Sequence, residues 1–225
     1  MRDARALPRL ARDCRLAVFD LDGTLYEQGP VRRRMMAELL TAPAAEGRLF
    51  RLNALRRYRH LREAEGADPM PGFEDRILTR LASETGRPRE EIRALVSEWM
   101  ERRPLRRLRA ARVRGAGRLF AGLRAKGVRV AVWSDYPVAD KLAALDLDAD
   151  DTASAGDADV GRLKPDPAGL RVLLDRAGCT PSEAVMIGDR ESRDGEAARA
   201  LGVAFLLRQK GGALPDFVAL ADSLA

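Results

Sequence analysis

Two acidic residues, Asp20 and Asp22, stand one residue apart in the segment Asp20-Leu21-Asp22-Gly23-Thr24. A turn that begins at Asp20 can direct both carboxylates into one site, and Gly23 lets the backbone turn where a side chain would obstruct it. Two acids in close reach can divide their work, one as an ionised nucleophile and the other as a proton carrier. A solvated surface turn is the alternative, but the apolar run 16–20 that leads directly into the acids argues against it.

Two further positions carry groups that could bind an anion. Ser134 follows the apolar run Val128–Trp133, and its hydroxyl could donate a hydrogen bond to a phosphate oxygen. Lys164, followed by Pro165, is one of four lysines in an arginine-rich chain, so composition alone does not account for it. Its compact charge could neutralise both a phosphate and a nucleophilic carboxylate. Taken singly, the serine could also be a turn or helix-cap residue and the lysine a solvated loop residue.

A third apolar run, Ala184–Ile187, ends at Gly188-Asp189, and a second acid, Asp194, follows five positions after Asp189. In their order along the chain, these segments resemble the motifs of the haloacid dehalogenase superfamily. The first motif of that family, Asp-x-Asp-x-Thr after a buried strand, matches residues 20–24. The second, third and fourth motifs match Ser134, Lys164-Pro165 and the Gly188-Asp189 segment.

The resemblance implies a role for each matched residue. Asp20 is expected to attack phosphorus and Asp22 to act as the general acid and base. Mg²⁺ is expected to be held by the carboxylates of Asp20 and Asp189 and by the backbone carbonyl of Asp22, since Mg²⁺ prefers hard oxygen ligands. Asp194 is expected to bind a water of the metal or to orient the lysine, with a helix N-cap as the alternative. The residues expected to bind the phosphate are Ser134, Lys164 and Thr24.

Two positions bear on how far the resemblance extends. The dehalogenase branch of the family usually lacks the second acid, so Asp22 favours phosphoryl transfer over cleavage of a carbon–halogen bond. The family commonly has Asn after the motif Ser, whereas this chain has Asp135. A carboxylate at this position would repel a bound phosphate unless it is paired or turned away.

Apolar runs that alternate with helical patterns organise the rest of the chain. A fourth run, Val203–Leu207, follows the three named above, and helices are predicted around residues 119–125, 170–177 and 197–201. Apolar strands alternating with helices favour an α/β fold, a doubly wound Rossmann-like parallel sheet covered on both faces. Ligands of such sheets bind beyond the carboxyl ends of the strands, where the candidate residues stand.

About a hundred residues separate the first two strands, which is too long for an ordinary crossover loop. We predict that an inserted helical cap domain occupies residues 29–107, between the two parts of a Rossmann-like core at 1–28 and 108–225. The predicted cap helices are Val31–Leu40, Leu49–Glu65, Glu74–Thr85 and Arg89–Glu101. One of them carries a basic cluster, which could face an anionic substrate or solvent: Arg56, Arg57, Arg59 and His60.

Composition narrows the partners. The net charge is +6, which we interpret as arginine-rich solvated helix faces, so nucleic acid is not expected as a partner. No apolar run of 18 residues predicts a membrane span, and residues 1–8 are too charged for the core of a signal peptide. Cys14 and Cys179 stand alone, which fits a reduced cytoplasm. A homodimer is left open.

The sequence therefore predicts a Mg²⁺-dependent phosphatase that hydrolyses a small phosphorylated metabolite through an aspartyl-phosphate on Asp20. A sugar phosphomutase on the same fold is one alternative. A non-catalytic, phosphate-binding regulatory protein is the other.

Overall fold

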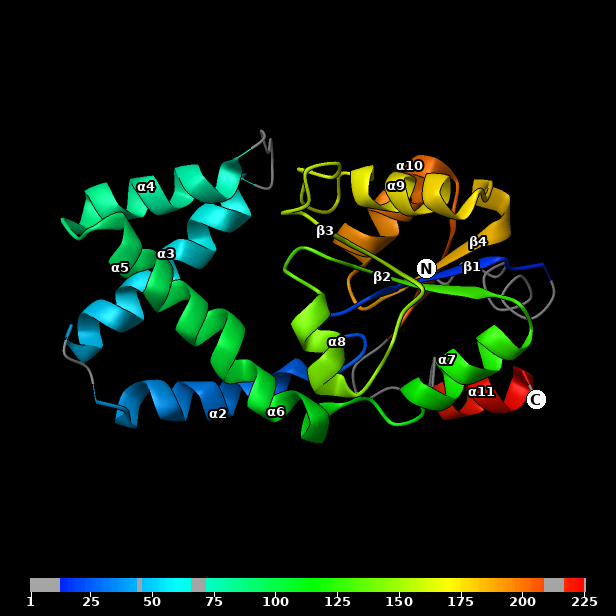
Figure 1. The fold of residues 1–225 in the computed structure, drawn as a ribbon, viewed down its shortest axis with the longest axis horizontal. Coiled ribbons are helices and arrows are strands. Elements are labelled where there is room, and N and C mark those ends of the chain that lie inside the picture. Colours follow the sequence, from blue (N-terminus) through cyan, green and yellow to red (C-terminus); the bar gives the residue numbers. More distant parts are fainter. Residues whose placement is uncertain (1–12, 44–45, 66–71, 209–216, 225) are drawn as a thin grey trace.

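In the computed structural model, residues 13–43, 46–65, 72–208 and 217–224 are described. Five parallel strands form one sheet, with the order β3-β2-β1-β4-β5. Their bounds are β1 Leu16–Asp20, β2 Arg129–Ser134, β3 Asp151–Ser154, β4 Ala184–Gly188 and β5 Ala204–Leu207. Helices cover both faces of the sheet (Figure 1), so the predicted doubly wound α/β fold is confirmed.

The first strand lies at the centre of the sheet and pairs with β2 and β4. Asp20 is level with Trp133 in β2, and Phe19 is level with Ile187 in β4. The carboxyl ends of the three central strands therefore meet at one edge, and each of them ends at or next to a polar candidate residue.

Successive side chains of a strand point to opposite faces of the sheet, so the strands contribute to two hydrophobic cores. On one face, Phe19 packs its ring 4.8 Å from that of Phe120 and 5.9 Å from that of Phe217. On the other face, Val18 and Trp133 pack among apolar residues of the opposite helices. The helices around the sheet are α7 Ala116–Ala125, α8 Ala139–Leu145, α9 Ala168–Ala177, α10 Glu196–Leu201 and α11 Phe217–Leu224. Because both faces of the strands are buried, the strands read as continuous apolar runs.

A second group of helices lies beside the sheet (Figure 1) and has a core of its own. Its members are α2 Gln28–Thr41, α3 Arg48–Glu65, α4 Phe73–Thr85, α5 Arg89–Val96, η1 Ser97–Arg102 and α6 Arg103–Ala111. All four predicted helices occur. The division into a cap domain at 29–107 and a core stays a prediction, and residues 1–12 of that core lie outside the described residues.

The helix predicted over Arg89–Glu101 was too short. It continues to Ala111 through η1, a π-helical turn. Pro104 explains the turn, since it has no N–H group to donate to the carbonyl four residues earlier, and the hydrogen bonding slips locally. The turn places Trp99 and Met100 toward a cavity next to the sheet.

Two short helical turns flank β4: η2 Pro181–Glu183, a 3₁₀ turn before the strand, and η3 Glu191–Gly195, a π-helical turn after it. In the described ranges, no helix combines the length and apolarity that crossing a bilayer requires.

Candidate active site

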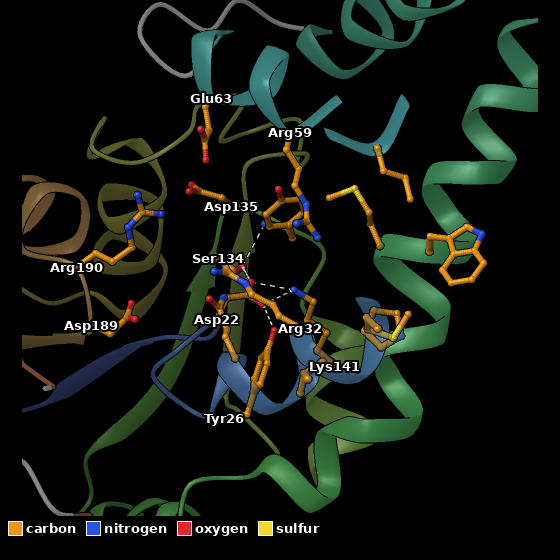
Figure 2. Close-up of a pocket in the computed structure, with 18 of the residues that line it drawn as sticks. Asp22, Tyr26, Arg32, Arg59, Glu63, Ser134, Asp135, Lys141, Asp189 and Arg190 are labelled. Atoms are coloured by element: carbon orange, nitrogen blue, oxygen red, sulfur yellow. Dashed lines mark hydrogen bonds and ion pairs between the residues drawn. The ribbon is translucent and has the colours of Figure 1, made fainter. Parts of the chain in front are cut away.

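A cavity of about 680 Å³ opens at the carboxyl edge of the sheet, between the strand ends and the α2–α6 helices. Asp20, Ser134 and Asp189 line it from the ends of β1, β2 and β4. Asp22 and Lys164 line it from the loops (Figure 2 shows Asp22, Ser134 and Asp189). The parallel sheet thus brings together residues that lie up to 169 positions apart in the chain.

Asp20 is 7 % exposed, and both of its carboxylate oxygens have partners. The Lys164 ammonium lies 2.7 Å from Oδ1, and the Thr24 hydroxyl donates to Oδ2 at 2.8 Å. Burial raises the pKa of Asp20 to about 8, although the charge of Lys164 opposes this rise. Without a cation, this carboxyl group therefore resists ionisation.

Thr24, which the sequence analysis places among the expected phosphate ligands, contacts Asp20 in this structure. The residue is fully buried, and its one hydroxyl proton is directed at Asp20. A hydroxyl has one proton to donate, and here that proton serves the carboxylate. In this arrangement Thr24 orients the Asp20 carboxylate.

Three carboxylates, those of Asp20, Asp189 and Asp194, place one oxygen each within 4.8 Å of one another. Gly23 makes room for them. A Cβ at Gly23 would lie 2.3 Å from Asp189 Oδ2, and its φ of +107° also favours glycine. Lys164 pairs with two of the three acids, Asp20 and Asp194, so the ammonium group cannot neutralise the cluster once all three acids are ionised. A hard divalent cation matches both this charge and these oxygen donors.

Lys164 is the buried centre of this cluster. Its Nζ donates to Asp20, to Asp194 Oδ1 at 2.8 Å and to the backbone carbonyl of Trp133 at 2.9 Å. Burial alone would lower the pKa of Lys164, but the carboxylates of Asp194 and Asp20 raise it above its ordinary value. The lysine is therefore charged throughout the neutral range.

Asp194 accepts hydrogen bonds from two groups. Lys164 donates to its Oδ1, and the backbone N–H of Arg190 donates to its Oδ2 at 3.1 Å. The N-cap of α10 is Gly195, without a side-chain hydrogen bond, so the N-cap interpretation of Asp194 is wrong. Instead, the acid lies inside the π-helical turn after β4, where it ties that turn to Lys164.

Asp22 sits beside this cluster and is held by three groups. Lys141 Nζ lies 2.7 and 2.8 Å from its two oxygens, Ser134 Oγ donates to Oδ2 at 3.0 Å, and the Tyr26 hydroxyl donates to Oδ1 (Figure 2). Burial would raise the pKa of Asp22, but the charge and hydrogen bonds of Lys141 outweigh it and lower the pKa below its usual range. Asp22 is therefore ionised in this state.

Lys141 and Tyr26 are site residues that were not predicted from the sequence. Lys141 comes from α8, and its contact with Asp22 depends on how that helix packs against the sheet. The rarity of lysine in this chain, which pointed to Lys164, was the available signal for Lys141.

Asp135 lines the cavity, and both of its carboxylate oxygens have partners. Its Oδ1 accepts the backbone N–H of Lys164 at 2.9 Å, and its Oδ2 pairs with Arg193 at 3.2 Å. Arg193 also donates to the carbonyl of Lys164 at 2.7 Å. Asp135 therefore joins the loops after β2 and β4 to the loop that carries Lys164.

The basic cluster of α3 divides according to helical periodicity. Arg56 and Arg59 line the cavity, whereas Arg57 pairs with Glu84 at 2.7 Å. His60 is exposed and does not line the cavity. Arg59 descends from α3 toward Ser134 and Asp135 (Figure 2), so one side of the predicted cluster faces the site.

A buried arginine, Arg62, connects α3 to the core. It donates to the backbone carbonyl of Asp135 and stacks over the ring of Tyr136 at 4.3 Å and that of Phe73 at 5.0 Å. It also pairs with Glu74. One side chain thus links the helical group to the loop that follows Ser134.

Comparison with known proteins shows what the chain is similar to. Phosphoglycolate phosphatase of Rhodospirillum rubrum is 31% identical to the chain, over 92% of this chain and 89% of its own. The structure of a 2-haloacid dehalogenase from Pseudomonas syringae matches with a TM-score of 0.63 and 20% identity, over 94% of this chain and 98% of its own. A Thermotoga maritima structure assigned as a β-phosphoglucomutase matches with a TM-score of 0.58 and 20% identity, over 92% of this chain and 90% of its own.

The family described as haloacid dehalogenase-like hydrolases matches residues 14–202, most of the chain. That range contains all the acids and both lysines of the site. This chain is therefore a member of the haloacid dehalogenase-like hydrolase family.

Proposed function

We propose that the protein is a Mg²⁺-dependent phosphatase that hydrolyses a phosphate monoester through an aspartyl-phosphate on Asp20. One observation carries the proposal. Asp20, at the tip of the central strand, shares Lys164 with one neighbouring acid and lies within 4.8 Å of two, while Asp22 borders the same cavity. This arrangement offers a nucleophile, a cation site and a proton carrier in one place.

The donor set fits the metal. The carboxylates of Asp20 and Asp189 and the backbone carbonyl of Asp22 would hold Mg²⁺, with Asp194 behind them because it is engaged with Lys164. When bound, Mg²⁺ supplies positive charge that offsets the excess of acids and the charge of the phosphoryl oxygens.

In the first half-reaction, an Asp20 oxygen would attack phosphorus and the bond to the leaving oxygen would break. Each carboxylate oxygen accepts one hydrogen bond here and keeps a second lone pair for attack. Lys164 stabilises negative charge on the transferred group, which is where phosphoryl transfer gains most of its catalysis. Asp22 would give a proton to the departing oxygen.

In the second half-reaction, water would attack the phosphorus of the acyl-phosphate and the bond to Asp20 would break. Asp22, which Lys141 keeps ionised, would take the proton of that water. Because Lys141 lowers the pKa of Asp22, this proton would then pass to solvent, and Asp22 would take up a proton again when the negative charge of the next phosphate ester arrives beside it. Ser134 and Tyr26 hold the Asp22 carboxylate in one orientation throughout.

Three rival activities make different demands on the site. A dehalogenase needs no proton carrier for a halide, yet Asp22 is present and held by three partners. A mutase must return the phosphoryl group to a sugar. A non-catalytic binding protein needs none of the ordered contacts around Asp20.

The test compares Asp20→Asn with a matched control, Asp140→Asn, which changes an exposed acid on α8. With Mg²⁺ and p-nitrophenyl phosphate, Asp20→Asn should lose all measurable turnover and keep its fold by circular dichroism, while the control should match the wild type. Near-normal turnover in Asp20→Asn would refute the proposal.

The rival activities have assays of their own. Chloride release from 2-chloropropionate would reveal a dehalogenase, and product analysis with sugar phosphates would reveal a mutase. A metal-dependent phosphatase should lose its activity in EDTA, whereas a binding protein should show no activity with or without the metal.

A further inference from the structure

The cavity continues from its acidic floor into the group of helices beside the sheet, and its character changes there. Around the floor, acids and lysines dominate. Farther in, the lining side chains are largely apolar: Met35, Met36, Leu52, Leu55, Trp99 and Met100. We refer to the part bounded by these six residues as the apolar chamber.

The walls of the apolar chamber all belong to one group of helices. Met35 and Met36 lie on α2, Leu52 and Leu55 on α3, and Trp99 in the π-helical turn. A movement of this group as a rigid body over the strand ends would narrow the floor. It would leave the space between its own helices unchanged.

One wall of the chamber is also held in place. Trp99 has the guanidinium of Arg51 at 4.5 Å and that of Arg103 at 4.2 Å from its ring centre. Arg51 is itself buried and hydrogen-bonded to Glu46 at 2.6 Å. Stacking of guanidinium groups on an indole fixes the ring, so this wall is formed before any ligand arrives.

Positive charge marks the border between chamber and floor. Arg32 and Arg59 line the cavity together with one acid of α3, Glu63, and no ion pair of the described residues involves either arginine. Arg59 points toward the floor beside Ser134 (Figure 2). A phosphate group would therefore be attracted to the floor end, which leaves the chamber for the rest of the molecule.

The size of the cavity also favours a substrate that extends beyond its phosphate group. At about 680 Å³ it falls in the range that holds ligands of drug size. A two-carbon phosphate ester would occupy the floor and leave the apolar chamber filled with water. Methionine side chains, of which the chamber has three, adapt their shape to apolar ligands.

We propose that the substrate is a phosphate monoester of an apolar alcohol whose hydrocarbon part fills the chamber between α2, α3 and the Trp99 turn. This inference rests on the proposed phosphatase function. It adds the substrate class, because burial of apolar surface is the binding energy that this chamber can supply.

A series of alkyl phosphates tests the inference at constant chemistry. Ethyl, butyl, hexyl and octyl phosphate have leaving groups of nearly equal basicity, so only the apolar length changes. Each added methylene that enters the chamber should raise kcat/KM about fourfold, from the free energy of burying one methylene. Phosphoglycolate, assayed alongside, should be a poorer substrate than octyl phosphate.

Substitutions inside and outside the chamber test whether the dependence of kcat/KM on chain length arises there. Met36→Gln on α2 and Leu52→Gln on α3 place an amide in the chamber and should lower the ratio of kcat/KM for octyl over ethyl phosphate about tenfold. Leu40→Gln and Leu49→Gln change exposed residues of the same helices that do not line the cavity, and should leave the ratio unchanged.

The outcomes separate the two proposals. A kcat/KM that stays flat or falls with chain length, or a preference for phosphoglycolate, overturns the chamber proposal while the phosphatase stands. Chamber variants that leave the ratio unchanged also overturn it. Failure to hydrolyse any ester with Mg²⁺, p-nitrophenyl phosphate included, overturns the phosphatase itself, and the chamber proposal falls with it.

Discussion

The ammonium group of Lys141 lies 2.7 and 2.8 Å from the two carboxylate oxygens of Asp22. Both side chains are largely buried, at 11 and 17 % exposure, so water screens the pair only weakly. The pair joins α8 to the loop after β1 and keeps the proposed proton carrier ionised.

Replacing Lys141 by Met should therefore shift the pH dependence of turnover. Without the ammonium charge, burial dominates and the pKa of Asp22 rises. With p-nitrophenyl phosphate the leaving group needs no proton, so kcat depends on Asp22 as a base in the hydrolysis of the intermediate. Hence the acidic limb of the kcat profile should move to higher pH in Lys141→Met.

Lys126→Met, which changes an exposed lysine, is the control and should keep the wild-type profile. Loss of one partner of a buried pair should also cost about 3 kcal/mol of the free energy of unfolding, measured in urea. An unmoved acidic limb in a folded Lys141→Met protein would show that Lys141 does not set the ionisation of Asp22.

Asp135 gives a second prediction, because one carboxylate serves both Lys164 and Arg193. Asp135→Asn keeps an oxygen that can accept the Lys164 N–H, and Arg193 keeps its bond to the Lys164 carbonyl. Asp135→Ala leaves that N–H without its acceptor and frees the loop. We expect near wild-type kcat/KM in the Asn variant and a loss approaching 100-fold in the Ala variant, since small displacements of a catalytic group cost this much.

Steady-state kinetics with p-nitrophenyl phosphate measures the difference. Equal activity of the Asn and Ala variants would mean that Asp135 does not position Lys164. A large loss in both variants would point instead to a need for its charge.

The third prediction concerns Arg62, which ties α3 to the carbonyl of Asp135 and stacks on Tyr136. Arg62→Ala removes these contacts and the ion pair with Glu74, which keeps only the hydroxyl of Tyr58 as a buried partner. The loss should be about 3 kcal/mol in the free energy of unfolding, together with faster hydrogen exchange in α3.

Arg57→Ala on the same helix is the matched control. Its ion pair with Glu84 is exposed, and pairs of this kind contribute little. Hydrogen exchange in α3 should therefore stay at the wild-type rate. If hydrogen exchange in α3 were no faster in Arg62→Ala than in Arg57→Ala, Arg62 would not be the residue that holds α3 to the loop after Ser134.

Much of the site was predictable because an apolar run that stops at a polar residue marks a strand end. Runs 16–20, 128–133 and 184–187 correspond to β1, β2 and β4, within one residue at each end. Parallel pairing then places their carboxyl ends together without any knowledge of the loops. The acids at these ends needed no tertiary information to be found.

The parts that were missed depend on packing. The edge strand β3 has four residues, of which Asp151 and Thr152 are only half buried, so it carries no apolar run. Lys141 reaches Asp22 from a helix, at a distance that no local pattern encodes. The partners of Asp135 could not be read from the sequence either, because they come from loops that meet only in the folded protein.

The last prediction links metal, pH and stability through Asp20. Burial raises the pKa of this carboxyl group from 3.8 to about 8 in the folded, metal-free protein. Between these two values, the folded state holds a proton that the unfolded state has lost, so its stability falls as the pH rises. Asn cannot ionise, and Asp20→Asn should therefore have a higher Tm than the wild type in EDTA near pH 8. The difference should shrink toward pH 5, where Asp20 is protonated in the folded protein.

Mg²⁺ should raise the Tm of the wild type near pH 8 more than that of the variant, since the cation stabilises the ionised form. Asp140→Asn should follow the wild type in every condition. A variant less stable than the wild type near pH 8 in EDTA would contradict the shift, and a wild-type Tm indifferent to Mg²⁺ would contradict a metal site at Asp20.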